Sequence, residues 1–144
     1  MQYVQVKRSA EMDQLKDIRW KQRFRNFEKS YNLLNQYINQ PIKTELERAG
    51  IIQFFEICFE LSWKLMKDYL EAQEFSVKSP RETIKQAYQI GLIDDGHVWI
   101  DALSDRNLTV HTYDEKIANK MFNDIAKVYF TELKKLYHKL LKEL

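Results

Sequence analysis

Apolar residues recur along the chain at spacings of three and four, and this pattern predicts a string of long helices. The first predicted helix runs from about Glu11 to Gln40, where Pro41 stops it. Its apolar positions are Leu15, Ile18, Phe24, Phe27, Tyr31, Leu34 and Ile38.

A second helix is predicted from Thr44 to about Gln73. Thr44 and Glu47 have the spacing of a capping box, in which each side chain bonds the backbone N–H of the other residue. The helix carries a broad apolar stripe, which is typical of the central helix of a bundle. The stripe consists of Ile51, Phe55, Cys58, Phe59, Ser62, Leu65, Met66 and Tyr69.

Two shorter helices are expected next. Ser79, Pro80 and Glu82 supply a cap, a first helical residue and a capping-box partner, and Gly91 ends this third helix. The fourth helix is capped by one of two adjacent aspartates, Asp94 or Asp95. Its apolar face consists of Val98, Trp99, Ala102 and Leu103.

The last predicted helix runs from about Tyr113 to the end of the sequence. Its stripe consists of Ile117, Met121, Ile125, Val128, Leu133, Leu136 and Leu140. Its final part, ELKKLYHKLLKEL, is basic and amphipathic. Lysines near a helix C-terminus complement the helix dipole, so this charge needs no nucleic acid or membrane to explain it.

Composition supports an all-α fold in one domain spanning residues 1–144. The chain is 44% hydrophobic and holds only 3 glycines and 2 prolines, so a few long helices are expected rather than many turns. We predict an up-and-down bundle of about five helices, similar to a four-helix bundle. The net charge of +2 does not favour a protein that coats nucleic acid non-specifically.

The single cysteine, Cys58, excludes an internal disulfide framework and a thiolate metal cluster. It lies in an apolar run and is expected to be a small buried side chain. The first residues are too polar for a secretory signal, and no apolar run reaches the roughly 18 residues of a membrane span. A cytoplasmic location is therefore expected. We also expect no cofactor and no metal site.

Three charged residues of the second helix, Glu56, Glu60 and Lys64, share one face at a spacing of four. The simplest interpretation is an exposed ion pair between Glu60 and Lys64. The alternative is that the two glutamates point toward a shared polar cleft.

The segment DRNLTVHTYDE differs from the helices around it, because Arg106, His111 and Tyr113 fall within eight positions. In one unbroken helix, His111 would be rotated by about 140° from Arg106, and the groups would not converge. Thr112 and Glu115 form another potential capping box, so a new helix can begin at Tyr113. We therefore expect the fourth helix to end or kink between residues 108 and 112.

Such a corner suits an anionic ligand. The free N–H groups of a helix start and the planar guanidinium of Arg106 bind phosphate, and His111 transfers protons near neutral pH. Together these groups could cleave a phosphodiester without a metal, with His111 taking the proton of a ribose 2′-OH and Arg106 stabilising charge on the phosphate. Three such residues near a helix corner are more often capping and surface contacts, and short motifs alone are weak indicators.

The spacing Arg-x4-His-x-Tyr resembles the motif of the HEPN superfamily, in particular its HepT-like branch, also described as nucleotidyltransferase substrate-binding proteins. The segments FELSWKLMKDYLEA, SPRETIKQAYQIGLID and WIDALSDRNLTVHTYDE resemble the same family. The resemblance extends from about Ile51 onward.

The resemblance implies a helical bundle that forms a homodimer with its motifs facing each other. It implies a metal-independent ribonuclease toxin, with Arg106 and His111 catalytic and with Asn107 a polar motif position. It further implies a partner, a minimal nucleotidyltransferase of the MntA type, which blocks the toxin by transferring AMP to Tyr113 and with which a hetero-oligomer could form. The alternatives are a non-catalytic nucleotide- or substrate-binding subunit and a purely structural helical module.

Overall fold

The structure is a computed structural model that describes residues 2–109 and 114–144, with side chains from residue 8 onward and, before the gap, up to residue 108. The described residues are helical and include no strand, which confirms the all-α class. In chain order the elements are α1 (Gln2–Ile38), α2 (Glu45–Ala72), α3 (Pro80–Gln89), α4 (Gly96–Thr109), α5 (Glu115–Asp124), the π-helical turn η1 (Ile125–Tyr129) and α6 (Phe130–Leu141).

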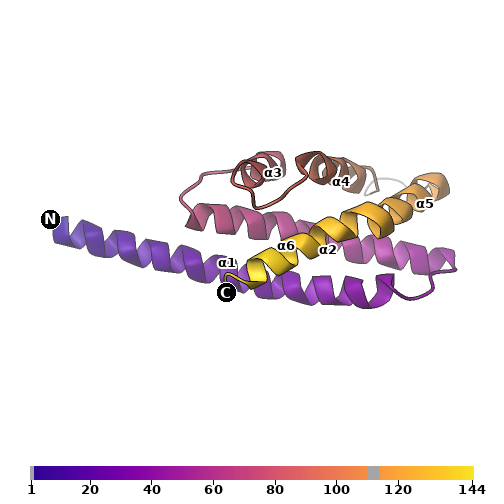
Figure 1. The fold of residues 1–144 in the computed structure, drawn as a ribbon, viewed down its shortest axis with the longest axis horizontal. Helices are drawn as coiled ribbons and strands as arrows, with labels where there is room; N and C mark the ends of the chain where they lie inside the picture. Colours follow the sequence, from indigo (N-terminus) through magenta and orange to yellow (C-terminus); the bar gives the residue numbers. More distant parts are fainter. Residues whose placement is uncertain (1, 110–113) are drawn as a thin grey trace.

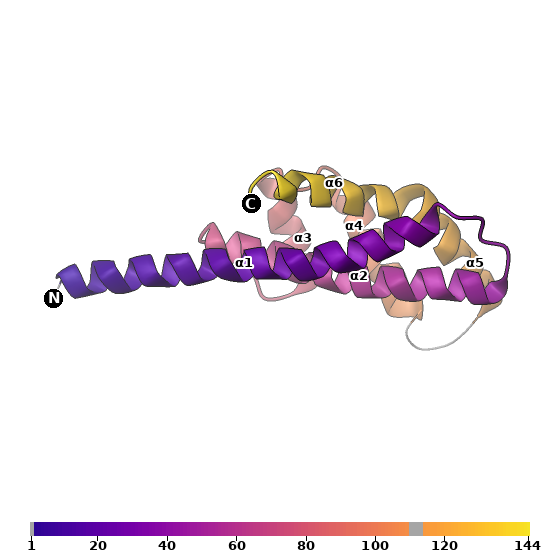
Figure 2. The same ribbon diagram turned by 90° about the horizontal axis from the view of Figure 1, so that it is seen from below.

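Two long helices and the terminal helix run along the length of the molecule. Figure 1 shows α1 and α2 antiparallel to each other, with α5, η1 and α6 forming one continuous rod across them. The shorter α3 and α4 lie side by side against α2, and the second view shows that both cross the long axis (Figure 2). The last turn of α4 and the first turn of α5 therefore lie at the same end of the bundle.

The core lies where α1, α2 and the terminal helix meet, and it is rich in aromatic rings. Tyr31 of α1 stacks on Tyr137 and Phe130, with ring centroids 4.4 and 5.6 Å apart. The predicted apolar stripes supply most of this core. Its fully enclosed members include Phe24, Phe27, Leu34, Phe55, Phe59, Leu65, Met66, Ile125 and Leu140.

The predicted helix starts at Thr44 and Ser79 are confirmed. The Thr44 hydroxyl accepts from the N–H of Glu47 and the Glu47 carboxylate accepts from the N–H of Thr44, so both halves of the capping box are present. The Ser79 hydroxyl accepts from the N–H of Glu82. At α4, Asp95 is the capping residue, because its carboxylate accepts from the N–H of Val98 at 3.2 Å.

The predicted start of the last helix at Tyr113 is wrong, because α5 begins at Glu115. Asp114 caps α5, with one carboxylate oxygen accepting from the N–H groups of Lys116 and Ile117 at 2.9 and 3.2 Å. An aspartate bonds these orphan donors as well as a threonine does, and here it lies two residues further along the chain.

A π-helical turn interrupts the predicted apolar stripe of the last helix. Because a π turn inserts extra residues per turn, positions beyond it rotate relative to a regular helix. Val128, predicted for the core, is 39% exposed, whereas its neighbour Tyr129 is buried.

The first helix starts earlier than predicted, at Gln2 rather than near Glu11. Its first turns extend past the end of the bundle (Figures 1 and 2). Leu15 and Ile18, which the pattern placed on the apolar stripe, are 61% and 44% exposed, because no described element packs over them. The buried part of the stripe begins at Trp20.

Candidate functional site

Arg106 lies on the last turns of α4 and forms an ion pair with Glu60 in the middle of α2. Its Nη2 is 2.5 Å from Oε2 of Glu60. Both side chains are half-buried, at 25% and 30% exposed. The pair joins two residues that are far apart in the sequence, and it holds the guanidinium at a defined position where α4 ends.

The Glu60 carboxylate also contacts Lys64, whose Nζ lies 3.2 Å from Oε1. Partial burial raises the pKa of Glu60, but the nearby polar groups of Trp63 and Lys64 and the charges of Arg106 and Lys64 outweigh it, so the pKa lies below its usual value. Glu60 is therefore ionised at neutral pH and can balance the charge of Arg106. The predicted Glu60–Lys64 pair is confirmed, and Glu60 also reaches Arg106. The alternative of a polar cleft shared by Glu56 and Glu60 stays a prediction.

The residue before Arg106 is anchored separately. Asp105 accepts a hydrogen bond from the hydroxyl of Tyr129, which lies in the π-helical turn. Burial and this hydrogen bond both raise the pKa of Tyr129, so the phenol stays protonated and remains a donor. The last turns of α4 are thus tied to α2 through Arg106 and to the terminal helix through Asp105.

The predicted interruption of the helix is confirmed, since α4 ends at Thr109 and α5 begins at Glu115. Asn107 is exposed on the last turn of α4, beside the exposed Leu108. His111 and Tyr113 lie outside the described residues, so whether they converge on Arg106 stays a prediction. Within the described part of the site, the structure provides a half-buried guanidinium oriented by Glu60, and the first N–H groups of α5 are capped by Asp114.

An acidic hollow of about 440 Å³ lies between α4 and the α5–η1 segment. Its charged lining residues are Asp101, Asp105, Asp124 and Lys120, and Lys120 bonds Asp124 at 2.8 Å. Over the described residues, no group of His, Cys, Asp and Glu side chains has the arrangement of a metal site.

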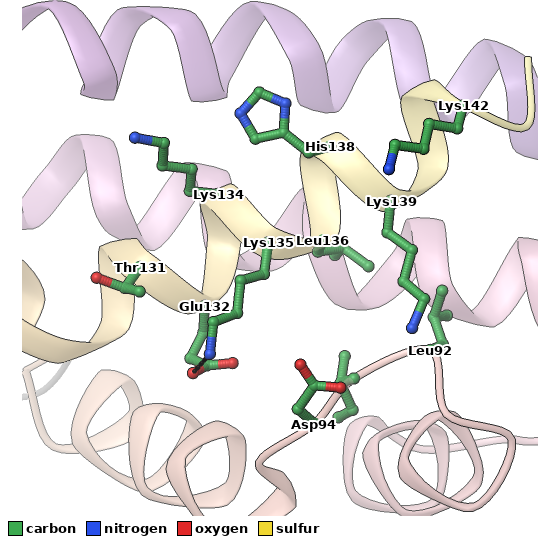
Figure 3. Close-up of a pocket in the computed structure, with 11 residues that line it drawn as sticks. Leu92, Asp94, Thr131, Glu132, Lys134, Lys135, Leu136, His138, Lys139 and Lys142 are labelled. Atoms are coloured by element: carbon green, nitrogen blue, oxygen red, sulfur yellow. Dashed lines mark hydrogen bonds and ion pairs between the residues drawn. The ribbon is translucent and has the colours of Figure 1, made fainter.

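A larger groove of about 470 Å³ separates α6 from the segment between α3 and α4. Figure 3 shows that Lys139 reaches down to this segment, whereas Lys134 and His138 point away from it. Lys139 donates to the carbonyl of Gly91, and Lys135 bonds Glu132 at 3.2 Å. Lys139 thus joins α6 to this segment, whereas Lys135 and Glu132 pair within α6. None of the described residues that line the groove belongs to the motif, so the groove is not the preferred functional site.

The fold and this helix junction define a helical bundle with a charged motif at one end, and comparison with known proteins assigns its family. Residues 22–142 match the family described as nucleotidyltransferase substrate binding protein like. The chain therefore belongs to the nucleotidyltransferase substrate-binding protein family, the HepT-like branch of the HEPN superfamily, as its motif indicated.

One relative is a curated Haemophilus influenzae protein named "Probable ribonuclease HepT". It is 34% identical to this chain over 82 residues, which are 54% of this chain and 56% of the relative. The match thus spans little more than half the length of that protein.

Two solved structures share the fold. A Thermus thermophilus protein is 31% identical, with a TM-score of 0.73, and the match covers 79% of this chain and 98% of that one. A Haemophilus influenzae protein, whose structure was described as revealing the fold of a substrate binding domain of a nucleotidyltransferase, is 28% identical. Its TM-score is 0.60, and the match covers 85% of this chain and 96% of that one.

Two residues of the site were not assigned to it from the sequence. Glu60 was predicted as a surface partner of Lys64, and Tyr129 was not singled out at all. The helical spacing of Glu56, Glu60 and Lys64 indicated a charged face on α2, but only the fold shows that α4 crosses this face at Arg106. Over the described residues, none of the helices is long and apolar enough to cross a membrane.

Proposed function

We propose that this protein is a metal-independent endoribonuclease, in which Arg106 and His111 act on the RNA phosphate. The observation that carries the proposal is the position of Arg106 in the motif, half-buried and held by Glu60 where α4 ends. The name of the Haemophilus relative supports the same activity.

In the proposed reaction His111 takes the proton from a ribose 2′-OH, which attacks the adjacent phosphorus. Arg106 stabilises the negative charge that develops on the phosphate oxygens. The ion pair with Glu60 fixes one edge of the guanidinium, so little ordering is required when the phosphate binds. Asn107, exposed on the same turn, is proposed as a further polar contact to the RNA.

We propose that the active form is a homodimer in which His111 from each subunit faces a shared cleft. Two proton-transfer groups are then available to act as base and acid, although each chain supplies one motif histidine. Exposed apolar side chains near the motif support such an interface. Leu108, two residues after Arg106, is 59% exposed, and Ile57, one turn before Glu60, is 49% exposed.

The proposed partner is a minimal nucleotidyltransferase of the MntA type, which neutralises the ribonuclease by transferring AMP to Tyr113. If Tyr113 converges on Arg106 as the motif predicts, an adenylate on this tyrosine places a bulky anion where the RNA phosphate is expected to bind. Co-expression followed by mass measurement of the intact protein tests this step, with Tyr113→Phe as the variant that should stay unmodified.

A second candidate function is a non-catalytic subunit that presents a nucleotide or another acceptor to the nucleotidyltransferase. The description of the Haemophilus influenzae structure, as a substrate binding domain of a nucleotidyltransferase, favours it. On this model the motif binds phosphate but cleaves nothing, so RNA binding would be retained without turnover.

Cleavage of RNA by the purified protein in the presence of a chelator distinguishes the two functions. We expect His111→Ala to lose cleavage by a factor of about 10² to 10⁴ without unfolding the bundle. His97→Ala is the matched control, because His97 lies on the first turn of α4 at the opposite end from the motif, and it should keep full activity. Equal rates for wild type and His111→Ala would favour the binding subunit.

A further inference from the structure

The first turns of α1 form an arm, residues 8–19, whose early part extends past the bundle (Figures 1 and 2) and whose later part lies beside the end of α2. Every side chain of the arm is exposed except that of Lys16, which is half-buried, and Trp20 is the first buried residue of the helix. The family match starts only at residue 22. The arm therefore lies outside the part of the chain that matches the family, and none of its described side chains belongs to the buried core.

The arm carries an exposed apolar stripe, whose Met12 borders a hollow beside Phe75 while Leu15 and Ile18 lie further from α2. Met12, Leu15 and Ile18 recur every third residue and are 57%, 61% and 44% exposed. At 3.6 residues per turn, Leu15 is rotated by about 140° from Trp20 and about 180° from Phe24, the residues that pack into the core. The described elements of the same chain leave Leu15 and Ile18 uncovered, and Met12 is only partly screened by the hollow beside Phe75.

The arm continues the packed part of α1 and so needs no nucleation of its own, but its turns gain little packing stability unless their apolar face is buried. The stripe also interleaves with charges of both signs, as in helices that pair with another helix. Glu11 precedes the stripe and Arg19 follows it, and both lie within about 40° of Leu15 around the helix axis.

We propose that the arm pairs with the arm of a second copy of this chain, antiparallel and with the two-fold axis at Leu15. Side chains of matching or complementary character lie at equal spacings on either side of Leu15. Met12 and Ile18 lie three positions on either side of it, and Glu11 and Arg19 lie four positions on either side. An antiparallel two-fold therefore brings Met12 level with Ile18 of the second copy, and Glu11 level with its Arg19.

The charges of Glu11 and Arg19 favour antiparallel over parallel pairing of the arms. Parallel arms would place Glu11 beside Glu11 and Arg19 beside Arg19, which costs free energy on both sides. Arg19 remains available for the antiparallel contact, because its side chain is 60% exposed and its ion pair with Glu71 is long, at 3.8 Å.

The arm contact alone is small. Three half-exposed side chains from each copy bury much less than the roughly 1,600 Å² of a standard stable interface. Pairing is therefore weak between separate molecules, and it strengthens where another contact already joins the copies. The proposal does not depend on the ribonuclease function; if the active form is a dimer through the motif, arm pairing joins such dimers into larger assemblies.

Disulfide cross-linking of the full chain tests the register directly. The native thiol, Cys58, is fully buried and does not compete. Under mild oxidation we expect Leu15→Cys to form a cross-linked dimer readily. Met12→Cys mixed with Ile18→Cys should cross-link more than either variant alone. Leu46→Cys, at the first turn of α2 and 83% exposed, is the control that should stay monomeric on a denaturing gel.

Charge reversal provides a second, independent readout. Glu11→Arg should weaken self-association in sedimentation at low salt, and Glu11→Arg with Arg19→Glu should restore it. Failure of Leu15→Cys to cross-link, or a preference of Met12→Cys for itself, overturns the proposal. It is also overturned if Leu15→Glu leaves self-association unchanged but weakens the complex with a co-expressed nucleotidyltransferase, because the arm would then bind that protein instead.

Discussion

Replacing Glu60 by Gln removes the negative charge that holds Arg106 while keeping the shape of the side chain. The Glu60 carboxylate lies 2.5 Å from the guanidinium and 3.2 Å from Lys64. In the variant, the half-buried guanidinium of Arg106 keeps its desolvation cost but loses the attraction of the Glu60 charge. We therefore expect the variant to be less stable at neutral pH.

The magnitude follows from the partial burial of the pair. Two unit charges about 4 Å apart attract by about 4 kcal/mol at an effective dielectric constant of about 20. The net stabilisation by the ion pair is smaller, because both charges lose part of their hydration and both side chains remain 25–30% exposed. For fully exposed pairs the net stabilisation is below about 1 kcal/mol. We expect Glu60→Gln to lower the free energy of unfolding by about 1 to 2 kcal/mol at pH 7.

The pH dependence gives the prediction its sharpest form. Because the pKa of Glu60 is lowered in the folded state, its contribution is fully present above the unfolded pKa of about 4.3. This contribution is lost as the pH falls through the lower pKa of the folded state. The difference in stability between wild type and Glu60→Gln should therefore shrink steadily below about pH 4.

Urea unfolding followed by circular dichroism at pH 7 and at decreasing pH measures this difference. Lys64→Gln is the control, because Lys64 is 41% exposed and its removal should cost less than about 0.5 kcal/mol. A difference between wild type and Glu60→Gln that stays constant below pH 3, or that is absent at pH 7, would refute the role assigned to the carboxylate.

Three further predictions concern the fold around the site. Tyr129→Phe leaves the carboxylate of Asp105 without its phenol donor and should cost about 1 to 2 kcal/mol in urea unfolding, whereas Tyr88→Phe, at a 55% exposed tyrosine, should cost almost nothing. Thr44→Ala removes the capping hydroxyl of α2 and should cost about 1 kcal/mol, most of which Thr44→Ser should restore. Burial raises the pKa of Cys58 to about 12, so its thiol should react with a thiol reagent at pH 8 only as fast as the protein unfolds around it. A rapid reaction in the folded state would contradict this burial.

Much of the fold could be predicted from the sequence because its signals are local. The capping residues Thr44 and Ser79 and the stripes of α1 and α2 depend on neighbours within a few positions. The π-helical turn could not be predicted, because the regular spacing that places Val128 in the core assumes 3.6 residues in every turn. Asp114 was missed as the cap of α5, because Thr112 offered an equally plausible capping box two residues earlier.

The site was only partly predictable, since its contacts link distant parts of the chain. The local pattern identified Arg106 and the interruption of the helix after it. The packing of α4 against α2 and η1 cannot be read from any local pattern. Two contacts depend on this packing, Arg106–Glu60 and Asp105–Tyr129. The roles of His111 and Tyr113, and the assignment of residues 1–144 to one domain, stay predictions.

The central claim is that Arg106 and His111 act together on one RNA phosphate. The most direct measurement is the rate of RNA cleavage by wild type, Arg106→Ala, His111→Ala and the double variant, all shown to be folded. When two residues act as one unit, removing both costs no more activity than removing one. We therefore expect each single variant to cleave RNA at least about a hundredfold more slowly than wild type. The double variant should be no slower than the slower of the two single variants. Full activity in either single variant, or a double variant slowed by the product of the two single losses, would contradict the claim.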